Sequence, residues 1–181
     1  PKIWRQVLVS ADSTLFELHH IIQIAMGWTN SHLYEFDIRS QKFGTRYEGG
    51  EDFYDENFTD AFDVTIADLG LKTKAKFTYL YDFGDSWRHS ITIEKVEEPE
   101  TKVKLPYCLD GDQHCPPEDC GGIYGYYDML EIIQTEDHPD REEYLEWLGE
   151  DFDPTHFDKA DVNKQLKKFD KYMSQLLDDS E

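Results

Sequence analysis

Apolar and polar side chains alternate along residues 79–93, YLYDFGDSWRHSITI, on both sides of a short turn. Tyr79 and Tyr81 share one face before the turn, and Ile91 and Ile93 share one face after it. A period of two residues is that of a β-strand, in which successive side chains point to opposite faces. The segment therefore predicts a hairpin of two strands.

The turn of this hairpin concentrates polar residues at the end of a sheet. Gly84 is expected to give the turn its permissive backbone, and Asp82, Asp85 and Ser86 can accept hydrogen bonds from the turn's own N–H groups. Polar chemistry is therefore expected at the tip of a buried sheet.

One segment near the N-terminus has the marks of an amphipathic helix. Thr14 and Glu17 form a capping box before it, and Gly27 ends it. Its apolar residues recur at helical spacing, which predicts that one side of the helix lies on the sheet. His19 and His20 are adjacent and so about 100° apart around the helix axis, which lets only one of them share the buried edge.

Further strands are predicted on both sides of this helix. A short strand or helical turn is also expected just before the central hairpin. The predicted segments are residues 1–9, 32–39 and 41–47 for strands, 49–63 for an exposed acidic loop, and 64–71 for the short strand or turn.

The second half of the chain changes from strands to helices. Residues 106–122 are rich in Pro and Gly, which predicts a rigid segment without regular structure. Beyond it, a period near 3.6 predicts helices over residues 126–134, 141–148 and 159–177. Strands followed by helices are typical of an α+β fold, here a mixed β-sheet with one helix packed on it and a C-terminal helical layer.

The chain has 181 residues, of which 39% are hydrophobic and 14% aromatic, enough to bury the core of one domain. We therefore expect a single domain over residues 1–181. Residues 1–105 would form the sheet and the first helix, residues 106–122 the rigid Cys/Pro/Gly loop, and residues 123–181 the helical part.

The formal net charge of -21 is concentrated in two acidic segments. Residues 51–71 contain seven acidic residues and no Lys or Arg, and residues 106–158 contain sixteen acidic residues and one basic residue, Arg141. Because proteins bind nucleic acids mainly by neutralising phosphates with Lys and Arg, direct binding of DNA or RNA is disfavoured. The acidic surface either keeps the protein soluble or binds cations or a basic partner.

The sequence contains no run of about 18 apolar residues and no signal peptide, so we expect a cytoplasmic protein without a membrane partner. Three cysteines, Cys108, Cys115 and Cys120, lie close together. An odd number of cysteines in such a protein argues against a disulfide framework.

The first candidate site is a zinc site formed by Cys108, His114, Cys115 and Cys120. Zinc binds thiolate and imidazole ligands, and a rigid loop with four such ligands would hold it as a structural ion. The spacing differs from that of paired C-x2-C knuckles, and the neighbours His114 and Cys115 would need an unusual geometry to share one ion. Ordinary buried or free thiols are the alternative interpretation.

A second candidate site gathers histidines and carboxylates near the hairpin turn. Residues from the helix, from the start of a strand and from behind the turn could meet at one end of the sheet and hold a divalent ion or perform acid/base chemistry. Capping aspartates, structural histidines and a core Trp are the alternative interpretation. The residues of this candidate pocket are His19, His32, Asp82, Asp85, Trp87, His89, Glu118 and Asp119.

The segment PPEDCGG at residues 116–122 also has two interpretations. In the first, it is a stiff turn whose acids cap the helix that begins near Tyr124, while its glycines provide positive φ angles or a close backbone approach. In the second, it is a rigid acidic loop beside the hairpin that grips a basic peptide or an ion.

Several segments of the chain, in this order and at these spacings, resemble one family of domains. They are PKIWRQVLV, TLFELHHIIQIAMGW, HLYEF, YLYDFGDSWRH and LPYCLDGDQHCPPEDCGGIYGY. Over nearly its whole length the chain is similar to the domains named after the third open reading frame of a Ri plasmid, which occur on plasmids, in insertion elements and in microbial chromosomes. The resemblance implies an α+β fold with a β-grasp-like first part and a strand before Pro1. It implies no catalytic residues, because no activity is established for the family.

The sequence supports three hypotheses about function. It contains no Walker-type loop, nucleophile elbow or HExxH motif, so we expect a soluble, non-enzymatic module that binds a protein or peptide through the hairpin tip and the acidic loop. The second hypothesis is a metal-dependent hydrolase-like enzyme that uses His19, His32, His89, Asp82 and Asp85. The third is an acidic protein that occupies the nucleic-acid-binding surface of a partner.

Overall fold

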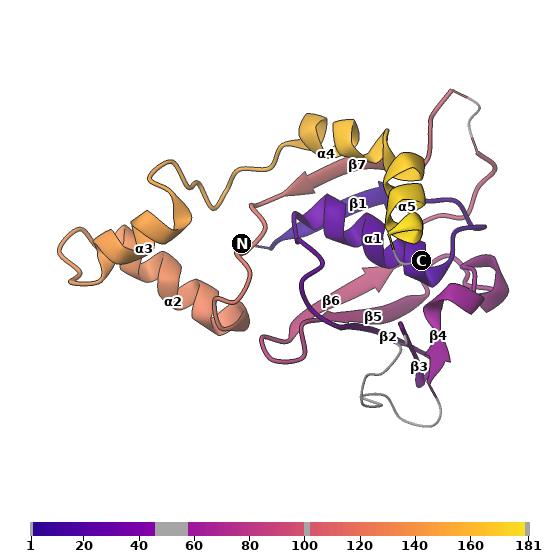
Figure 1. The fold of residues 1–181 in the computed structure, drawn as a ribbon, viewed down its shortest axis with the longest axis horizontal. Coiled ribbons are helices and arrows are strands. Elements are labelled where there is room, and N and C mark those ends of the chain that lie inside the picture. The colour runs from indigo at the N-terminus through magenta and orange to yellow at the C-terminus, as the bar shows by residue number, and fades with distance from the viewer. Residues whose placement is uncertain (1, 46–57, 100–101, 180–181) are drawn as a thin grey trace.

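The computed structural model describes residues 2–45, 58–99 and 102–179 (Figure 1). The strands are β1 (Trp4–Leu8), β2 (Tyr34–Ile38), β3 (Gln41–Gly44), β4 (Thr59–Asp60), β5 (Lys76–Tyr81), β6 (Trp87–Thr92) and β7 (Tyr107–Asp112). The helices are α1 (Leu15–Met26), α2 (Gly122–Gln134), α3 (Arg141–Leu148), α4 (Lys159–Leu166) and α5 (Phe169–Asp178), with short 3-10 turns at Ala61–Asp63 and Ala67–Leu69. The fold is α+β, as predicted. Most of the predicted acidic loop, residues 49–57, lies outside the described residues.

The main sheet has the strand order β4-β3-β2-β5-β6. Strands β5 and β6 form the predicted hairpin, with Tyr81 opposite Trp87. Strand β2 pairs antiparallel with β5, so that Phe36 lies opposite Tyr79. The alternation seen in the sequence puts buried aromatic side chains on these neighbouring strands: Tyr34, Phe36, Phe77, Tyr79 and Tyr81.

Helix α1 packs against these aromatic residues. Its two ends are those predicted, since the Thr14 side chain accepts a hydrogen bond from the Glu17 N–H while the Glu17 carboxylate accepts one from the Thr14 N–H. Gly27 ends the helix with a φ of 112°. The ring of His19 stacks on that of Tyr34 at a centroid distance of 3.6 Å, which joins the helix to the sheet.

The prediction that only one of the two adjacent histidines could be buried is wrong. His19 and His20 are each 1% exposed. His20 faces the C-terminal layer, where its Nδ1 lies 2.9 Å from the hydroxyl of Tyr172 in α5. The helix is thus covered on two sides, by the sheet and by α5, and Leu166 and Phe169 of the C-terminal helices belong to the same buried cluster.

The prediction that residues 106–122 lack regular structure is wrong for β7. This strand pairs antiparallel with β1 in a second, two-stranded sheet, with Val7 opposite Cys108. The side chain of Asn163 in α4 binds both backbone groups of Cys108, at 2.7 Å to the N–H and 2.9 Å to the C=O. The partners of β7 are therefore distant in sequence, and the local Pro and Gly pattern could not indicate them.

The predicted helix over residues 159–177 is divided into α4 and α5 by Lys167 and Lys168. Leu166 and Phe169 are both buried on either side of this break, so the apolar spacing continues across it. The hydrophobic pattern alone therefore gave no sign of two helices.

Helices α2 and α3 lie side by side at one end of the molecule, away from α4 and α5 (Figure 1). Helix α2 buries Tyr126, Met129 and Ile133, whereas α3, which is described over its full length, buries none of its residues. In the described ranges, no helix has the length and apolar character needed to cross a membrane.

Candidate functional site

The hairpin tip is shaped by Asp82. Its Oδ1 accepts hydrogen bonds from the N–H groups of Gly84, at 2.9 Å, and Asp85, at 3.2 Å. Asp82 and Ser86 have positive φ angles of 63° and 59°, whereas Gly84 does not, so the expectation that Gly84 supplies the permissive backbone is wrong. Aspartate tolerates this left-handed conformation because its side chain can bind the neighbouring backbone.

The PPEDCGG segment, residues 116–122, lies directly against this tip. The Gly121 N–H donates to Asp85 Oδ2 at 3.2 Å, and a Cβ atom at Gly122 would lie only 2.3 Å from the carbonyl oxygen of Asp85. The glycines thus allow the close approach that one interpretation of the sequence expected. The acids do not cap α2, because no side chain caps the helix at Gly121.

The carboxylate of Glu118 is held in place by groups from two other segments. Its Oε1 accepts hydrogen bonds from the Thr29 N–H and from the Tyr81 hydroxyl, each at 2.9 Å. The Tyr81 oxygen in turn accepts a hydrogen bond from the Ser31 N–H at 2.9 Å. Burial raises the pKa of Tyr81, so the hydroxyl keeps its proton and donates it to Glu118.

His32 brings the tip and the loop together. Its Nε2 lies 2.8 Å from Asp119 Oδ1, 3.5 Å from Asp82 Oδ2 and 3.6 Å from Glu118 Oε2. This nitrogen is covered from solvent, and none of the three contacts has the geometry of a hydrogen bond. A single imidazole nitrogen thus lies within ion-pair distance of three carboxylates, nearest to Asp119, and forms a hydrogen bond with none of them.

The ligand atoms of His32, Asp82 and Asp119 all lie within 4.8 Å of one another. In the part of the chain that the structure describes, they are the one group of at least three His, Cys, Asp or Glu side chains this close. Tetrahedral ligands at about 2.1 Å from a metal ion are about 3.4 Å apart, so a closure of at most about 1.4 Å would bring these atoms to coordination distance. The residues therefore fit a divalent ion.

The site is open on one side. The Asp82 side chain is 9% exposed, whereas that of Asp119 is 66% exposed. A surface depression of about 340 Å³, lined by residues 30–33, adjoins His32. A bound ion would therefore be reachable from solvent.

His19, which the sequence placed in this pocket, lies in a closed network inside the core. Its Nδ1 is 2.6 Å from the Tyr79 hydroxyl and its Nε2 is 2.7 Å from Asn30 Oδ1. The Tyr79 oxygen also accepts a hydrogen bond from Gln23 Nε2 at 2.9 Å. Burial lowers the pKa of His19 to about 3, so both nitrogens of a neutral ring are occupied and His19 is not available as a ligand.

Three other predicted pocket residues also lie outside the cluster. His89 Nδ1 is 2.8 Å from the carbonyl oxygen of Trp87, and burial lowers the pKa of His89. Trp87 is buried against Trp28, with ring centroids 5.1 Å apart. Asp85 binds the backbone of the loop rather than His32. Of the eight predicted residues, the structure brings four together: His32, Asp82, Glu118 and Asp119.

The structure does not assemble the predicted zinc site. Among the described residues, Cys108, His114, Cys115 and Cys120 do not form a group with ligand atoms close enough to share an ion. His114 Nδ1 instead lies 2.6 Å from the Cys115 carbonyl oxygen. Burial raises the pKa of each thiol, that of Cys120 to about 11, and so favours the neutral form.

Sequence reasoning missed the residues that orient Glu118. Tyr81 was assigned only to the aromatic face of the sheet, although it is the last residue of β5 and its hydroxyl reaches the loop. Thr29 and Ser31 lie in the polar run between α1 and β2. Both contribute through backbone N–H groups, which no side-chain pattern could reveal, and the Thr29 hydroxyl also donates to Glu118 Oε1 at 3.2 Å.

Comparisons with known proteins agree with the fold. The model of the family described as plasmid pRiA4b ORF-3-like protein matches residues 1–161. The uncharacterized protein y4hQ of Sinorhizobium fredii (strain NBRC 101917 / NGR234) is 40% identical over 168 residues, 92% of this chain and 84% of that protein. The crystal structure of a protein of unknown function, MM3350 from Methanosarcina mazei Go1, has a TM-score of 0.80 and 32% identity and covers 90% of each chain. The chain therefore belongs to the family of plasmid pRiA4b ORF-3-like proteins.

Proposed function

We propose that this protein holds one divalent transition-metal ion at the hairpin tip, through His32, Asp82 and Asp119, and uses it in hydrolysis. The observation that carries the proposal is the position of His32 Nε2, which has three carboxylates within 3.6 Å and a hydrogen bond to none. Three crowded carboxylates repel one another, and an imidazole nitrogen can serve them only one at a time. A cation bound by His32, Asp82 and Asp119 would offset the repulsion among the three carboxylates.

The ligand types favour a first-row transition metal. Zinc binds imidazole nitrogen and carboxylate oxygen, whereas Mg²⁺ and Ca²⁺ prefer oxygen ligands alone. Such mixed sites generally bind Zn²⁺ more tightly than Mn²⁺. We therefore expect affinity to fall in the order Zn²⁺, Mn²⁺, Mg²⁺.

The open side of the site favours a catalytic ion over a structural one. Structural zinc is closed in by four protein ligands, and catalytic zinc keeps a position for water or substrate. His32, Asp82 and Asp119 leave such a position, beside the depression at residues 30–33. Glu118, fixed by Thr29 and Tyr81 and 3.6 Å from His32 Nε2, would be the general base beside such an ion, which would supply Lewis acidity.

Calorimetric titration of the untagged protein with Zn²⁺, Mn²⁺ and Mg²⁺ tests the metal site. We expect one ion per chain, and a loss of affinity of at least about tenfold in His32→Ala and in Asp82→Asn. Asparagine keeps the oxygen that accepts the turn's hydrogen bonds, so Asp82→Asn should preserve the hairpin. His156→Ala and Asp170→Asn, at exposed positions outside the cluster, are the matched controls.

Equal affinities in wild type and in both site variants would contradict the proposal, as would a loss of binding in Cys108→Ser alone. Hydrolysis of p-nitrophenyl acetate and bis(p-nitrophenyl) phosphate by the metal-loaded protein tests the catalytic part. Rates above those of the free ion, lost in His32→Ala, are expected. If the protein binds the ion but hydrolyses neither substrate faster than the free ion does, the ion has a structural role only.

A further inference from the structure

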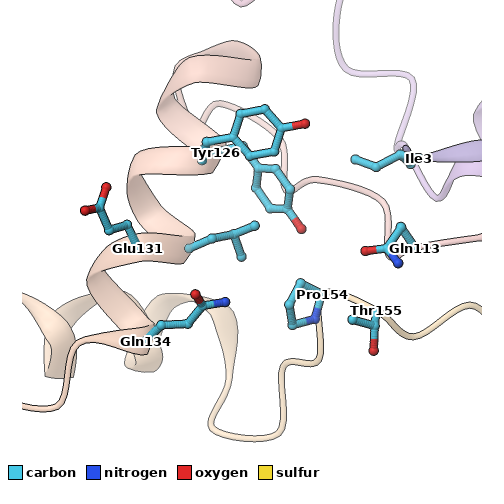
Figure 2. Close-up of a pocket in the computed structure, with 9 residues that line it drawn as sticks. Ile3, Gln113, Tyr126, Glu131, Gln134, Pro154 and Thr155 are labelled. Carbon is cyan, nitrogen blue, oxygen red and sulfur yellow. The ribbon is translucent and has the colours of Figure 1, made fainter. Parts of the chain in front are cut away.

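A pocket of about 300 Å³ lies between α2 and the segments that it faces (Figure 2). Tyr126, Tyr127 and Leu130 line it from the helix, and Ile3 and Pro154 line it from the opposite side. Figure 2 shows the Ile3 side chain pointing across the pocket toward the helix. The walls are therefore mainly apolar and aromatic, and the volume is sufficient for one large apolar side chain.

The charged residues of the lining and of its direct sequence neighbours, here called the rim, are mainly acidic. Glu131 belongs to the lining, and Figure 2 shows its carboxylate turned outward. Asp112, Asp128 and Asp153 are exposed and directly adjoin lining residues in the sequence, against one basic neighbour, Lys2. A positively charged partner would therefore be attracted to the pocket, and a negatively charged one repelled.

The surrounding helical arm, residues 122–153, is also rich in acidic and exposed aromatic residues. It contains eleven acidic residues and one basic residue, Arg141, whose Nε donates to the carbonyl oxygen of Ile133. Large aromatic side chains are exposed on it, with Tyr124 83% and Trp147 51% exposed. Exposed aromatic rings among carboxylates bind guanidinium groups through cation–π contacts and ion pairs together.

We infer that this pocket is the docking site for an arginine-rich protein segment that inserts one large apolar side chain between α2 and Pro154. The charge of the rim selects the flanking arginines, and the apolar walls select the inserted side chain. The pocket is separate from the His32 cluster, so the inference stands whether or not the metal site is occupied.

Fluorescence anisotropy with labelled peptides tests this inference. The probe is the peptide RRLRR, with RRARR and EELEE as matched peptides. We expect RRLRR to bind about tenfold more tightly than RRARR, since leucine buries more apolar surface than alanine. EELEE should not bind, and raising the salt from about 50 mM to about 500 mM should weaken binding of RRLRR by screening the charges.

Two substitutions at exposed positions locate the site. Tyr127→Ala removes part of the wall, and Glu131→Lys reverses a charge on the rim; each should weaken RRLRR binding by about fivefold or more. Glu98→Lys, an exposed charge reversal outside the arm, should change it by less than about twofold. Circular dichroism melts establish that all three variants fold.

Three results would overturn the inference. Equal weakening by Glu131→Lys and Glu98→Lys would mean that the peptide senses only the overall negative charge. Equal binding of RRLRR and RRARR would mean that the pocket holds no side chain. A concentration-dependent dimer in analytical ultracentrifugation, abolished by Tyr127→Ala, would mean that a second copy of this chain covers the pocket instead.

Discussion

Two histidines in this protein lie in polar surroundings of opposite kinds. His19 is buried, and each of its ring nitrogens has one hydrogen-bonding partner, Tyr79 or Asn30. His32 is partly exposed, and its Nε2 faces three carboxylates without a hydrogen bond. In the first arrangement, which we call closed, both ring nitrogens have a hydrogen-bonding partner. In the second, which we call open, Nε2 has none and lies among negative charges.

The closed arrangement fixes one proton distribution. Because Asn30 Oδ1 can only accept, His19 Nε2–H donates to it, and the other nitrogen of the neutral ring, Nδ1, accepts from the Tyr79 hydroxyl. The Tyr79 oxygen in turn accepts from Gln23 Nε2. Gln23 Oε1 also accepts the Asn30 N–H at 2.9 Å. Both nitrogens of His19 are used in this ring of contacts, so it stabilises the packing of α1 on the sheet and leaves no nitrogen of His19 for a ligand.

His19 and His32 therefore differ in whether they are available to bind a ligand. A residue type that bears chemistry indicates a site only where its polar atoms remain unmatched. By this criterion His32, with Asp82 and Asp119, is the functional candidate, and His19 is part of the core.

Lowering the pH should destabilise the protein mainly through its buried histidines, of which His19 belongs to the closed arrangement. Burial lowers the pKa of His19 to about 3 and that of His20 to about 4, below their unfolded value of 6.5, so the unfolded chain takes up protons first as the pH falls. Stability is therefore complete above pH 6.5 and declines below it, by about 1.4 kcal/mol per pH unit for each imidazole. We expect urea unfolding to report a loss of about 3 kcal/mol between about pH 6.5 and 5. A His19→Gln variant should show a shallower decline, and an unchanged slope would contradict the assignment.

Gly122→Ala should separate the loop from the hairpin tip. The new Cβ would overlap the Asp85 carbonyl oxygen and would be placed on a residue with a φ of 73°, so we expect a destabilisation of about 3 kcal/mol and a loss of metal binding. Gly70→Ala is the control, because Gly70 has a φ of 59° but nothing within 4 Å of the added atom. Its cost should be about 1 kcal/mol, without effect on metal binding. Equal costs in the two variants would show that the close approach is unimportant.

His19→Leu and His32→Leu should have opposite effects: the first should lower stability, and the second should lower metal affinity. His19→Leu leaves the buried polar groups of Tyr79 and Asn30 without their partner and should cost about 2 kcal/mol, with metal affinity unchanged. His32→Leu, at a partly exposed position, should change stability by about 0.5 kcal/mol or less and abolish metal binding. Chemical denaturation and calorimetry measure both. Loss of metal binding in the His19 variant, with its fold intact, would remove the distinction between the two histidines.

Tyr81→Phe should have the smallest effect. It removes the hydroxyl that donates to Glu118 and accepts from Ser31, at a cost of about 1 kcal/mol. Because Glu118 keeps its hydrogen bond from Thr29, we expect metal affinity to fall by only about threefold, less than the roughly 10–100-fold that is typical of residues that orient a metal ligand. An affinity loss as large as that of His32→Ala would make Tyr81 essential to the site itself.

Much of the fold could be predicted because its signals are local. The capping box at Thr14, the αL glycine at position 27 and the alternation through Tyr79 each specify backbone geometry within a few residues. The β1–β7 sheet could not be predicted in this way. Its hydrogen bonds join residues about a hundred positions apart, and the Asn163 side chain completes its edge.

The candidate site could be predicted in part for the same reason. Asp82 stands out as a turn residue, and Glu118 and Asp119 as acids in a rigid loop, so their residue types and spacing were informative. Which histidine joins them depends on the directions of side chains from α1, β6 and the polar run before β2. Only the packed structure shows that His32 reaches the carboxylates while His19 and His89 bind core groups.

The most direct test of the central claim is anomalous diffraction from crystals of the untagged protein grown with Mn²⁺. We predict one anomalous peak among His32 Nε2, Asp82 Oδ2 and Asp119 Oδ1, at about 2.1 Å from each. We also expect a solvent molecule to coordinate the ion. A peak at the cysteines, or no peak at the hairpin tip at saturating metal, would contradict the assignment of the open cluster as a metal site.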